Sequence, residues 1–360
     1  MKKLTLIISS ITLLLLLWGC PNGINKQKYY EAWFPENPVN LGDVNSEFDD
    51  YNSALPETHF GKQLIFSSNR RSSGGDFDIV GDIIHATWMW DEGYLIIDNS
   101  SYWQNISFVG TLLYAMDKND NQYAPYMIGF DSLINDTIKR IYVFAYSTNS
   151  LSDCYRNEFM YFISDISGET GDVFPATQIP FLGNCSQQQY ISFYGPLVDN
   201  IDLWELNPNN FTQMYSDETT DGISNIYSTD IPDSLSFMEF LSADTDFEKQ
   251  KIDELSSGSN DKCPFVNGNF IVFTSDRPGG FGGYDLYYSY FENGNWTEAV
   301  NFGEQINSEY DEFRPVSMQA YNFRNDMMIF SSNRPGGLGG YDLYYVGIDR
   351  ITPHIIITDK

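Results

Sequence analysis

The chain is poor in the residues on which many catalytic and metal sites depend. Its 360 residues include three histidines and four cysteines, and only 20 basic residues stand against 49 acidic ones. No two cysteines have the Cys-x-x-Cys spacing that is typical of a zinc site. A Gly-x-Ser-x-Gly turn is also missing. The composition therefore argues against a structural zinc site and against a serine peptidase.

The shortage of basic residues leaves a formal net charge of −29. Such a surface disfavours nucleic acid and anionic lipid headgroups as partners, and favours cationic partners or divalent ions. The acidic residues are spread along the chain rather than clustered, a pattern typical of acidity that keeps a large β protein soluble. We expect no nucleic acid partner.

Long stretches with a helical period are lacking as well. What the chain has in quantity is aromatic residues, at 16% with 26 Phe and 25 Tyr, and these residues favour strands. No interdomain linker is evident from Trp33 onward. We therefore expect residues 33–360 to form one all-β domain.

One segment with two glycine pairs occurs more than once. The sequence FSSNRPGGLGGYDLYY at 330–345 matches FTSDRPGGFGGYDLYY at 273–288, and FSSNRRSSGGDFDIV at 66–80 is a weaker copy. In each copy nine positions separate a polar residue from a following aspartate, as the pairs Asn69 and Asp78, Asp276 and Asp285, and Asn333 and Asp342 show. Self-similarity at a fixed spacing indicates a repeat architecture.

The glycine pairs could in principle hold a phosphate, but a phosphate loop needs a helix start and a lysine after the glycines. Here a strand-like run follows, and no lysine does. We therefore interpret the segment as a tight hairpin in which glycine supplies positive φ. We expect a bidentate contact to brace each hairpin, pairing Arg70 with Asp78, Arg277 with Asp285, and Arg334 with Asp342.

The repeat has the size of a propeller blade, with four short strands in about 57 residues. The hairpins at Asn69 and Asp276 are separated by roughly 52 residues per blade over four steps, or about 69 over three. The expected fold is an all-β propeller of four-stranded antiparallel blades, for which six blades fit best and five or seven are possible. The segment WFPENPVNLG at 33–42 resembles the last strand of a blade and could close the ring. HIIITDK at 354–360 competes for that place.

The N-terminus reads as a bacterial export signal. Lys2 and Lys3 precede an apolar run that ends at Gly19-Cys20, which predicts a signal peptide at 1–19. Cys20 then lies where a lipoprotein carries its acyl chains, and 20–32 would be a short tether. An ordinary secretory peptide with an incidental cysteine is the alternative. A multiply acylated Cys20 would hold the protein at a membrane.

The repeats resemble the WD-repeat-like β-propeller repeats of the TolB type, on the strength of FTSDRPGGFGGYDLYY, WTEAVNFG and INSEYDEFRPV. That resemblance implies an exported propeller of the Gram-negative envelope, often lipid-anchored, at the outer membrane facing the periplasm or the cell surface. It also implies a binding or assembly platform for envelope proteins, without chemistry of its own. The resemblance is strong in the two C-terminal copies, moderate in the N-terminal copy, and limited to strand pattern in roughly 90–260.

Few single residues stand out as site candidates. Cys154 and Cys185 lie in one irregular segment and could form a disulfide in an oxidising compartment. Trp88, Trp90 and Trp103 could form an exposed contact patch for a protein or a glycan, although core positions are the simpler assignment. MDKNDNQY at 116–123 lacks the glycine and the glutamate of a calcium loop. We expect no cofactor, and a structural calcium ion stays open.

Two functions follow from these observations. The first is a lipid-anchored, non-enzymatic interaction or assembly scaffold, which the repeats and the resemblance favour. The alternative is an envelope glycan-binding protein or glycoside hydrolase, with carboxylates from different blades converging on the channel. No well-formed Asp-box is present, so the first function is the expectation.

Overall fold

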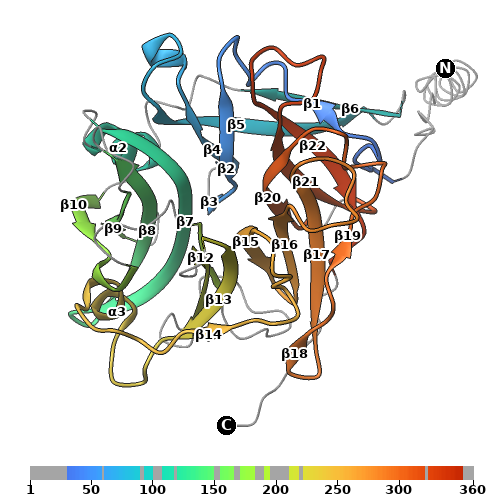
Figure 1. The fold of residues 1–360 in the computed structure, drawn as a ribbon. Coiled ribbons are helices and arrows are strands. Elements are labelled where there is room, and N and C mark those ends of the chain that lie inside the picture. Colours follow the sequence, from blue (N-terminus) through green and yellow to red (C-terminus); the bar gives the residue numbers. More distant parts are fainter. Residues whose placement is uncertain are drawn as a thin grey trace, which may run out of the picture.

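The computed structural model describes residues 31–58, 61–89, 93–99, 108–116, 120–149, 155–165, 171–182, 190–194, 211–218, 222–320 and 323–351. These residues form a five-bladed β-propeller, in which five antiparallel sheets surround a central axis (Figure 1). The expected all-β propeller is thus confirmed. Its blade number is five, one fewer than the repeat spacing favours.

Each blade is built from strands that are consecutive in the chain, apart from the last blade. Blades 1 and 2 contain β2 (Asp50–Ala54), β3 (Glu57–Thr58), β4 (Gly61–Ser68), β5 (Asp78–Met89) and β6 (Tyr94–Asn99), then β7 (Asn121–Ile134), β8 (Thr137–Asn149), β9 (Arg156–Ser164) and β10 (Gly171–Gln178). Blades 3 and 4 contain β11 (Ile191–Tyr194), β12 (Thr212–Glu218), β13 (Ser224–Asp230) and β14 (Gln250–Lys251), then β15 (Asp261–Asn267), β16 (Phe270–Ser275), β17 (Asp285–Glu292), β18 (Asn295–Trp296) and β19 (Val300–Asn301). Blade 5 contains β20 (Glu312–Met318), β21 (Asp326–Ser332), β22 (Asp342–Ile348) and β1 (Val39–Asn40).

The N-terminal segment closes the ring, which is one of the two possibilities that the sequence leaves open. Strand β1 pairs antiparallel with β22, with Val39 opposite Tyr345 and Asn40 opposite Tyr344. Asn45 strengthens this closure, since its side chain donates to the Leu343 carbonyl at 2.9 Å and accepts from the Leu343 amide at 2.9 Å. The first and last blades are therefore joined through one shared sheet. The competing segment 354–360 lies outside the described residues.

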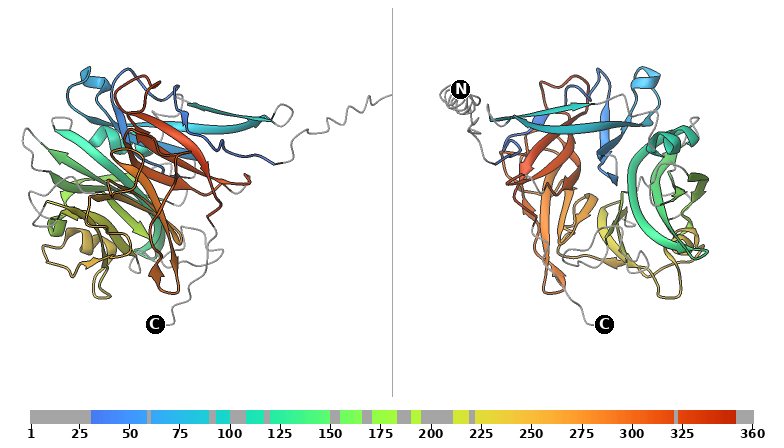
Figure 2. Two further views of the ribbon diagram at one scale, coloured as in Figure 1. Left: turned by 45° about the vertical axis from the view of Figure 1, so that its right-hand side comes forward. Right: turned by 180° about the vertical axis from the view of Figure 1, so that it is seen from behind.

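The blade number differs from six because the first three blades are long. Strands β5, β7 and β8 have 12, 14 and 13 residues, against six and eight for β16 and β17 of the regular fourth blade. Strands β5 and β6 extend as a long hairpin past the rest of the ring (Figure 2). The hairpins at Asn69 and Asp276 therefore lie three blades apart and not four.

The core consists of a separate apolar cluster between each pair of neighbouring blades. Strand β16 shows how the sequence produces this arrangement. Phe270 and Val272 pack toward blade 5, whereas Ile271 and Phe273 pack toward blade 3. Because successive side chains of a strand point to opposite faces, a continuous apolar run buries both faces of a blade. Phe273 has no exposed surface.

Two α-helices and two 3-10 helices complete the described part. Helix α2 (Phe108–Ala115) packs Val109 and Leu112 into the cluster between blades 1 and 2. Helix α3 (Phe237–Ser242) starts with a capping box of Ser236 and Glu239. The 3-10 helices are η1 (Arg70–Ser72) and η3 (Pro180–Leu182). None of the described helices is long and apolar enough to span a membrane.

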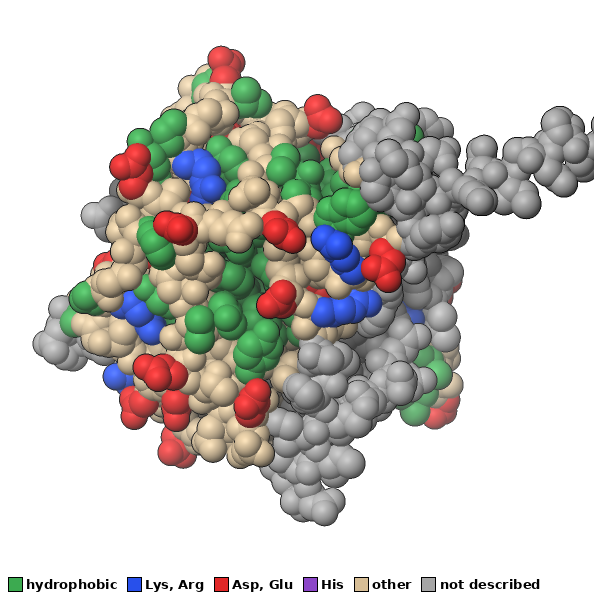
Figure 3. Space-filling view, turned by 90° about the vertical axis from the view of Figure 1, so that its right-hand side faces the viewer, with side chains coloured by type: hydrophobic (Ala, Val, Ile, Leu, Met, Phe, Trp, Pro, Cys, Tyr) green, Lys and Arg blue, Asp and Glu red, His purple; other side chains and the backbone are tan. Residues whose placement is uncertain are grey.

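Charged side chains on the flank of the ring are dispersed. On the face shown in Figure 3, acidic groups are scattered over neutral and apolar surface, and some basic groups lie directly beside acidic ones. This distribution agrees with the spread of acidic residues along the sequence. On that face, no single acidic patch marks a site.

Candidate functional site

The glycine hairpins of blades 4 and 5 are turns built around an aspartate. Asp285 accepts hydrogen bonds from the amides of Phe281 and Gly282 at 2.6 and 3.1 Å. Asp342 accepts in the same way from Leu338 and Gly339 at 2.5 and 3.1 Å. The amide groups that could have held a phosphate are therefore occupied by a side chain of the chain itself. This confirms the interpretation as a turn.

The predicted arginine partners are wrong. Arg70 pairs with Asp50 at 2.7 Å, Arg277 with Asp261 at 2.6 Å, and Arg334 with Glu312 at 2.8 Å, and all three carboxylates have fully buried side chains. Each acidic partner opens the innermost strand of the same blade, whereas Asp285 and Asp342 hold the glycine turn. The arginines therefore tie the hairpin to the inner strand. Each of these three buried carboxylates therefore lies beside a cation.

Each hairpin is also fastened to the next blade at its last residue, which is aromatic. The Tyr341 amide donates to Asp49 of blade 1 at 2.9 Å, and the Tyr341 carbonyl accepts from the Asp50 amide at 2.8 Å. Tyr284 makes the equivalent pair of bonds with Asp311 and the Glu312 amide of blade 5. Phe77 does so with Asn121 and the Gln122 amide of blade 2. These backbone bonds fix three aromatic side chains close to the axis.

The inner strands turn a second set of side chains toward the axis. Four of them carry an irregularity at the same place, where Asn52, Ala124, Cys263 and Arg314 have positive φ. The pairing register shifts at each of these positions, as expected for a β-bulge. Figure 1 shows β2, β7, β15 and β20 nearest the middle of the ring. The side chains that precede the bulges are Tyr51, Tyr123, Lys262 and Phe313.

Together the two sets form one aromatic group at the axis, which we call the axial cluster. Its members come from all five blades: Tyr51, Phe77, Tyr123, Tyr155, Tyr190, Tyr284, Phe313 and Tyr341. Tyr51 has ring contacts with Phe77 at 5.1 Å, Tyr123 at 6.3 Å and Tyr341 at 6.0 Å. Phe313 joins Tyr190 at 5.7 Å and Tyr284 at 5.5 Å. Six of the eight members are half-buried, and Tyr123 and Tyr190 are buried.

Carboxylates lie among these rings. The hydroxyl of Tyr341 donates to Asp311 at 3.1 Å, while Asp49 accepts from the amide of the same tyrosine. Burial is the largest cause that raises the pKa of Tyr341, and Asp311 and Asp49 raise it further. Burial likewise raises the pKa values of Tyr123 and Tyr284 to about 12. The phenols therefore remain neutral hydrogen-bonding groups beside charged acceptors.

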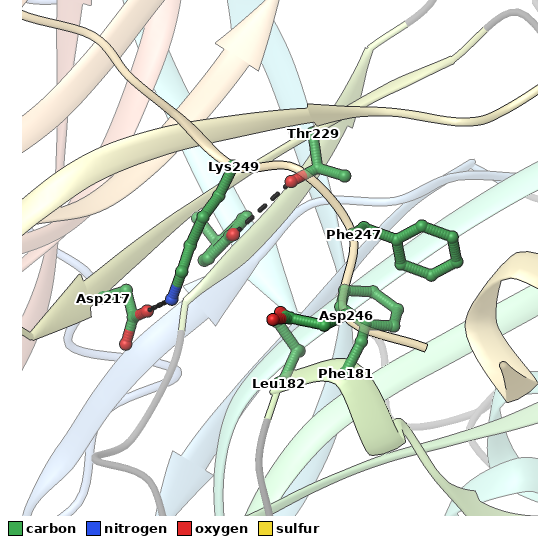
Figure 4. A pocket seen from close by; sticks show the side chains of 8 residues that line it. Phe181, Leu182, Asp217, Thr229, Asp246, Phe247 and Lys249 are labelled. Carbon is green, nitrogen blue, oxygen red and sulfur yellow. Dashed lines mark hydrogen bonds and ion pairs between the residues drawn. The ribbon is translucent and has the colours of Figure 1, made fainter. Parts of the chain in front are cut away.

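A separate hollow lies between blades 2 and 3, away from the axis. It has a volume of about 150 Å³ and is lined by Phe181, Leu182, Tyr215, Asp217, Thr229, Asp246, Phe247 and Lys249 (Figure 4). Lys249 forms an ion pair with Asp217 at 2.7 Å, and the Tyr215 hydroxyl lies 3.4 Å from that of Thr229. The polar groups of this hollow thus largely pair with one another, and we consider the axial cluster the stronger candidate.

Trp88 does not belong to an exposed contact patch. Trp88 lies on β5 with only 7% of its surface exposed, and it packs on Trp33 with ring centroids 4.2 Å apart. The core position is therefore the correct assignment for Trp88. Trp90 and Trp103 lie outside the described residues, as do Cys20, Cys154 and Cys185. Cys263 is a buried free thiol.

The described residues contain no group of three His, Cys, Asp or Glu side chains placed to hold a metal ion. Asp120 from the MDKNDNQY segment instead pairs with Arg156 at 2.9 Å. Asn121 accepts from the Phe77 amide. The polar side chains of this segment therefore join strands and blades.

The axial cluster has a signal in the sequence, at repeated positions next to the glycine hairpins and the inner strands. An aromatic residue directly precedes the repeated aspartate in Phe77-Asp78, Tyr284-Asp285 and Tyr341-Asp342. A second aromatic follows a polar residue in the first two positions of an inner strand, as in Asp50-Tyr51, Gln122-Tyr123 and Glu312-Phe313. Aromatics at one repeated position of a ring gather at its axis. That inference identifies six of the eight members.

Comparisons with known proteins give likenesses to solved structures. No protein-family model and no curated protein matches the sequence, so these two comparisons do not support the resemblance to TolB-type repeats. The structure is similar to an α-L-arabinofuranosidase from Lactobacillus brevis, with 10% identity, a TM-score of 0.41, and coverage of 84% of this chain and 92% of that one. It is similar to a GH62 hydrolase in complex with xylotriose, with 8% identity, a TM-score of 0.42, and coverage of 90% and 98%. A glycosyl hydrolase from Bacteroides ovatus has 10% identity, a TM-score of 0.39, and coverage of 90% and 96%.

These comparisons contradict the prediction of a non-enzymatic scaffold, because the matched structures are mostly glycoside hydrolases. The prediction that the chain is not an enzyme is corrected for the same reason. None of the three structures described above exceeds a TM-score of 0.42 or 10% identity. Their activities are therefore stated of those proteins alone, and the function of this chain is argued from its own residues.

Proposed function

We propose that the protein binds a neutral glycan at the axial cluster. The observation that carries this proposal is the convergence of eight aromatic side chains from all five blades, interleaved with carboxylates. Ligand sites in proteins combine apolar and aromatic walls with a few polar groups that fix orientation. The axial cluster has this composition.

A sugar ring fits this surface chemically. Its C–H face is apolar and packs against the face of an aromatic ring, while its hydroxyls need hydrogen-bond acceptors. Tyr51 and Tyr341 supply rings that lie 6.0 Å apart. Asp49 and Asp311 supply acceptors beside Tyr341, Asp49 at its backbone amide and Asp311 at its hydroxyl. A neutral glycan also avoids the repulsion that an anionic one would meet at a chain of net charge −29.

An array of neutral oligosaccharides, probed with the purified protein, tests this proposal. We expect binding by the wild type and an affinity loss of about tenfold or more for Tyr51→Ala or Tyr341→Ala, because each removes a stacking surface. The hairpin stays fastened in Tyr341→Ala, since Asp49 and Asp50 bind the backbone of that residue. Tyr114→Ala is the matched control, because this tyrosine is 82% exposed on α2, outside the axial cluster. No binding by the wild type, or equal losses in all three variants, would contradict the proposal.

Hydrolysis of the bound glycan is a second candidate. Asp49 and Asp311 favour it, since glycoside hydrolysis uses two carboxyl groups that flank the scissile bond. Both are half-buried and lie at opposite ends of one tyrosine. Release of reducing ends from the glycan that binds best on the array measures this activity. Release that persists in Asp49→Asn and Asp311→Asn would remove these carboxylates from the candidate list.

We also propose that the chain is exported and anchored through Cys20. The support is the basic start, the apolar run and the Gly19-Cys20 pair of the N-terminus. The resemblance to TolB-type envelope repeats suggests the same location. In a Gram-negative host fed a labelled fatty acid, the wild-type protein should incorporate label and sediment with membranes, and Cys20→Ala should do neither. Unchanged labelling of Cys20→Ala would reject the anchor without affecting the proposal on glycan binding.

A further inference from the structure

Arg314 is a buried cation at the axis, close to the axial cluster. Its side chain has no exposed surface. Its guanidinium lies over the ring of Tyr190 at 5.2 Å, and its Nη2 donates to the Pro125 carbonyl at 3.3 Å. Within the part of the chain that the structure describes, the Nε and Nη1 groups have no hydrogen-bond partner. One arginine from blade 5 therefore reaches blades 2 and 3 and leaves two nitrogens unpaired.

The charge of Arg314 is uncompensated within the described residues. The ionisable groups that act on it are Cys263, Tyr190 and Tyr126, and none of them is a carboxylate. The other inward arginines differ, because Arg70, Arg277 and Arg334 each bind a buried carboxylate. A guanidinium keeps its proton in proteins, and buried charges are normally paired. The missing partner must carry negative charge or be strongly polar.

A second unpaired donor lies near the same tyrosine. Asn52 accepts from the Tyr190 hydroxyl at 3.3 Å through Oδ1, and its buried Nδ2 has no partner among the described residues. Asn52 comes from blade 1, so donors from blades 1 and 5 meet around one ring of blade 3. The groups left open are all N–H donors. A ligand that accepts hydrogen bonds and carries no hydrogen, such as a simple anion, could bind all of these N–H groups.

We propose that the propeller axis holds a small monovalent anion, such as chloride, bound by Arg314 Nε and Nη1 and by Asn52 Nδ2. The anion neutralises the guanidinium where the five inner strands meet. It satisfies donors that would otherwise destabilise the fold. Arg314 and Asn52 have no exposed surface, so a glycan at the axial cluster would not contact them directly.

Chloride titration of thermal unfolding tests the site in solution. At constant ionic strength, with gluconate replacing chloride, the unfolding midpoint of the wild type should rise with chloride concentration, because a ligand that binds only the folded state stabilises it. Arg314→Met should lose this dependence. Asn52→Asp is the second variant, since it places a carboxylate near the guanidinium while keeping the side-chain shape. It should fold in the absence of chloride and respond little to it.

Arg140→Met is the matched control. Arg140 is 3% exposed but already paired with Asp131 at 2.8 Å, so its loss should lower the unfolding midpoint and leave the chloride dependence intact. Crystals grown in bromide provide a direct readout. An anomalous peak within hydrogen-bond distance of Arg314 supports the site. Water at that position together with a midpoint that does not respond to chloride would overturn it.

Discussion

Replacement of Glu312 by alanine should destabilise the propeller by about 3 kcal/mol, the scale of breaking a buried ion pair by removing one partner. The Glu312 carboxylate has no exposed surface and pairs with Arg334 at 2.8 Å. It also accepts from the Ser308 amide at 2.8 Å and from the Ser332 hydroxyl at 3.0 Å. The alanine variant removes the acceptor of the Ser308 amide and the Ser332 hydroxyl, and it removes the carboxylate that neutralises Arg334. Chemical denaturation of the purified variant measures the loss.

The matched control for Glu312 is an exposed acidic residue with an ion pair. Asp253 lies 3.6 Å from Lys251, and their side chains are 86% and 43% exposed. Asp253→Ala should change stability by less than about 1 kcal/mol, because solvent screens such a pair. A Glu312→Ala variant as stable as Asp253→Ala would show that the arginine clamps do not hold the hairpins to the inner strands.

Substitution of Gly339 by alanine should cost about 3 kcal/mol, the upper part of the range for forcing extra atoms into a packed site. A Cβ at this position would overlap the backbone carbonyl of Phe48 in blade 1. The overlap involves backbone of the neighbouring blade, so rotation of a side chain provides no relief. Thermal unfolding measures the effect, and Gly282→Ala should behave alike because its Cβ would overlap the Tyr310 carbonyl.

Gly42 provides the comparison for this prediction. A Cβ on Gly42 would lie 3.8 Å from the nearest atom, Asn40 Oδ1, which is ordinary contact. Gly42→Ala should therefore leave stability unchanged or raise it slightly, since alanine restricts the unfolded chain. Equal unfolding midpoints for Gly339→Ala and Gly42→Ala would mean that the glycines are not needed for close approach between blades.

The parts of the fold that the sequence predicts are those fixed by local pattern. The hairpins follow from the glycine pairs and their flanking strand-like runs. The segment at 33–42 is recognisable as a candidate for closing the ring, but only the structure decides between it and 354–360. The blade number does not follow, because it rests on the assumption of equal blades. Insertions lengthen β5, β7 and β8 without leaving a repeat signature. Dividing the length of the chain by the length of the regular repeat therefore gives one blade too many.

The acidic partners of the arginines could not be predicted from the sequence, for a different physical reason. The sequence places Arg277 eight positions before Asp285, and a contact inside the hairpin is the nearest option. In the fold, the first residue of the inner strand lies beside the hairpin, so Arg277 reaches Asp261. Asp285 is then free to hold the turn amides. Competition between two carboxylates for one arginine is decided by tertiary geometry.

The axial cluster could be predicted from the sequence only in part. Its aromatic residues occur at repeated positions, so the sequence contains the information, but their convergence depends on the ring. Tyr190 and Tyr155 come from degraded copies and carry no repeat signal. Arg314 is visible only in the structure, since nothing in EFRPV distinguishes a buried arginine from a surface one.

The measurement that tests the account most directly is a crystal structure of the protein with the oligosaccharide that binds best on the array. We predict a sugar ring packed against Tyr51 or Tyr341, with its hydroxyls hydrogen-bonded to Asp49 or Asp311. The hollow lined by Phe181 and Phe247 provides an internal alternative in the same crystal. Sugar density in that hollow, with none at the axial cluster, would contradict the assignment of the axis as the glycan site.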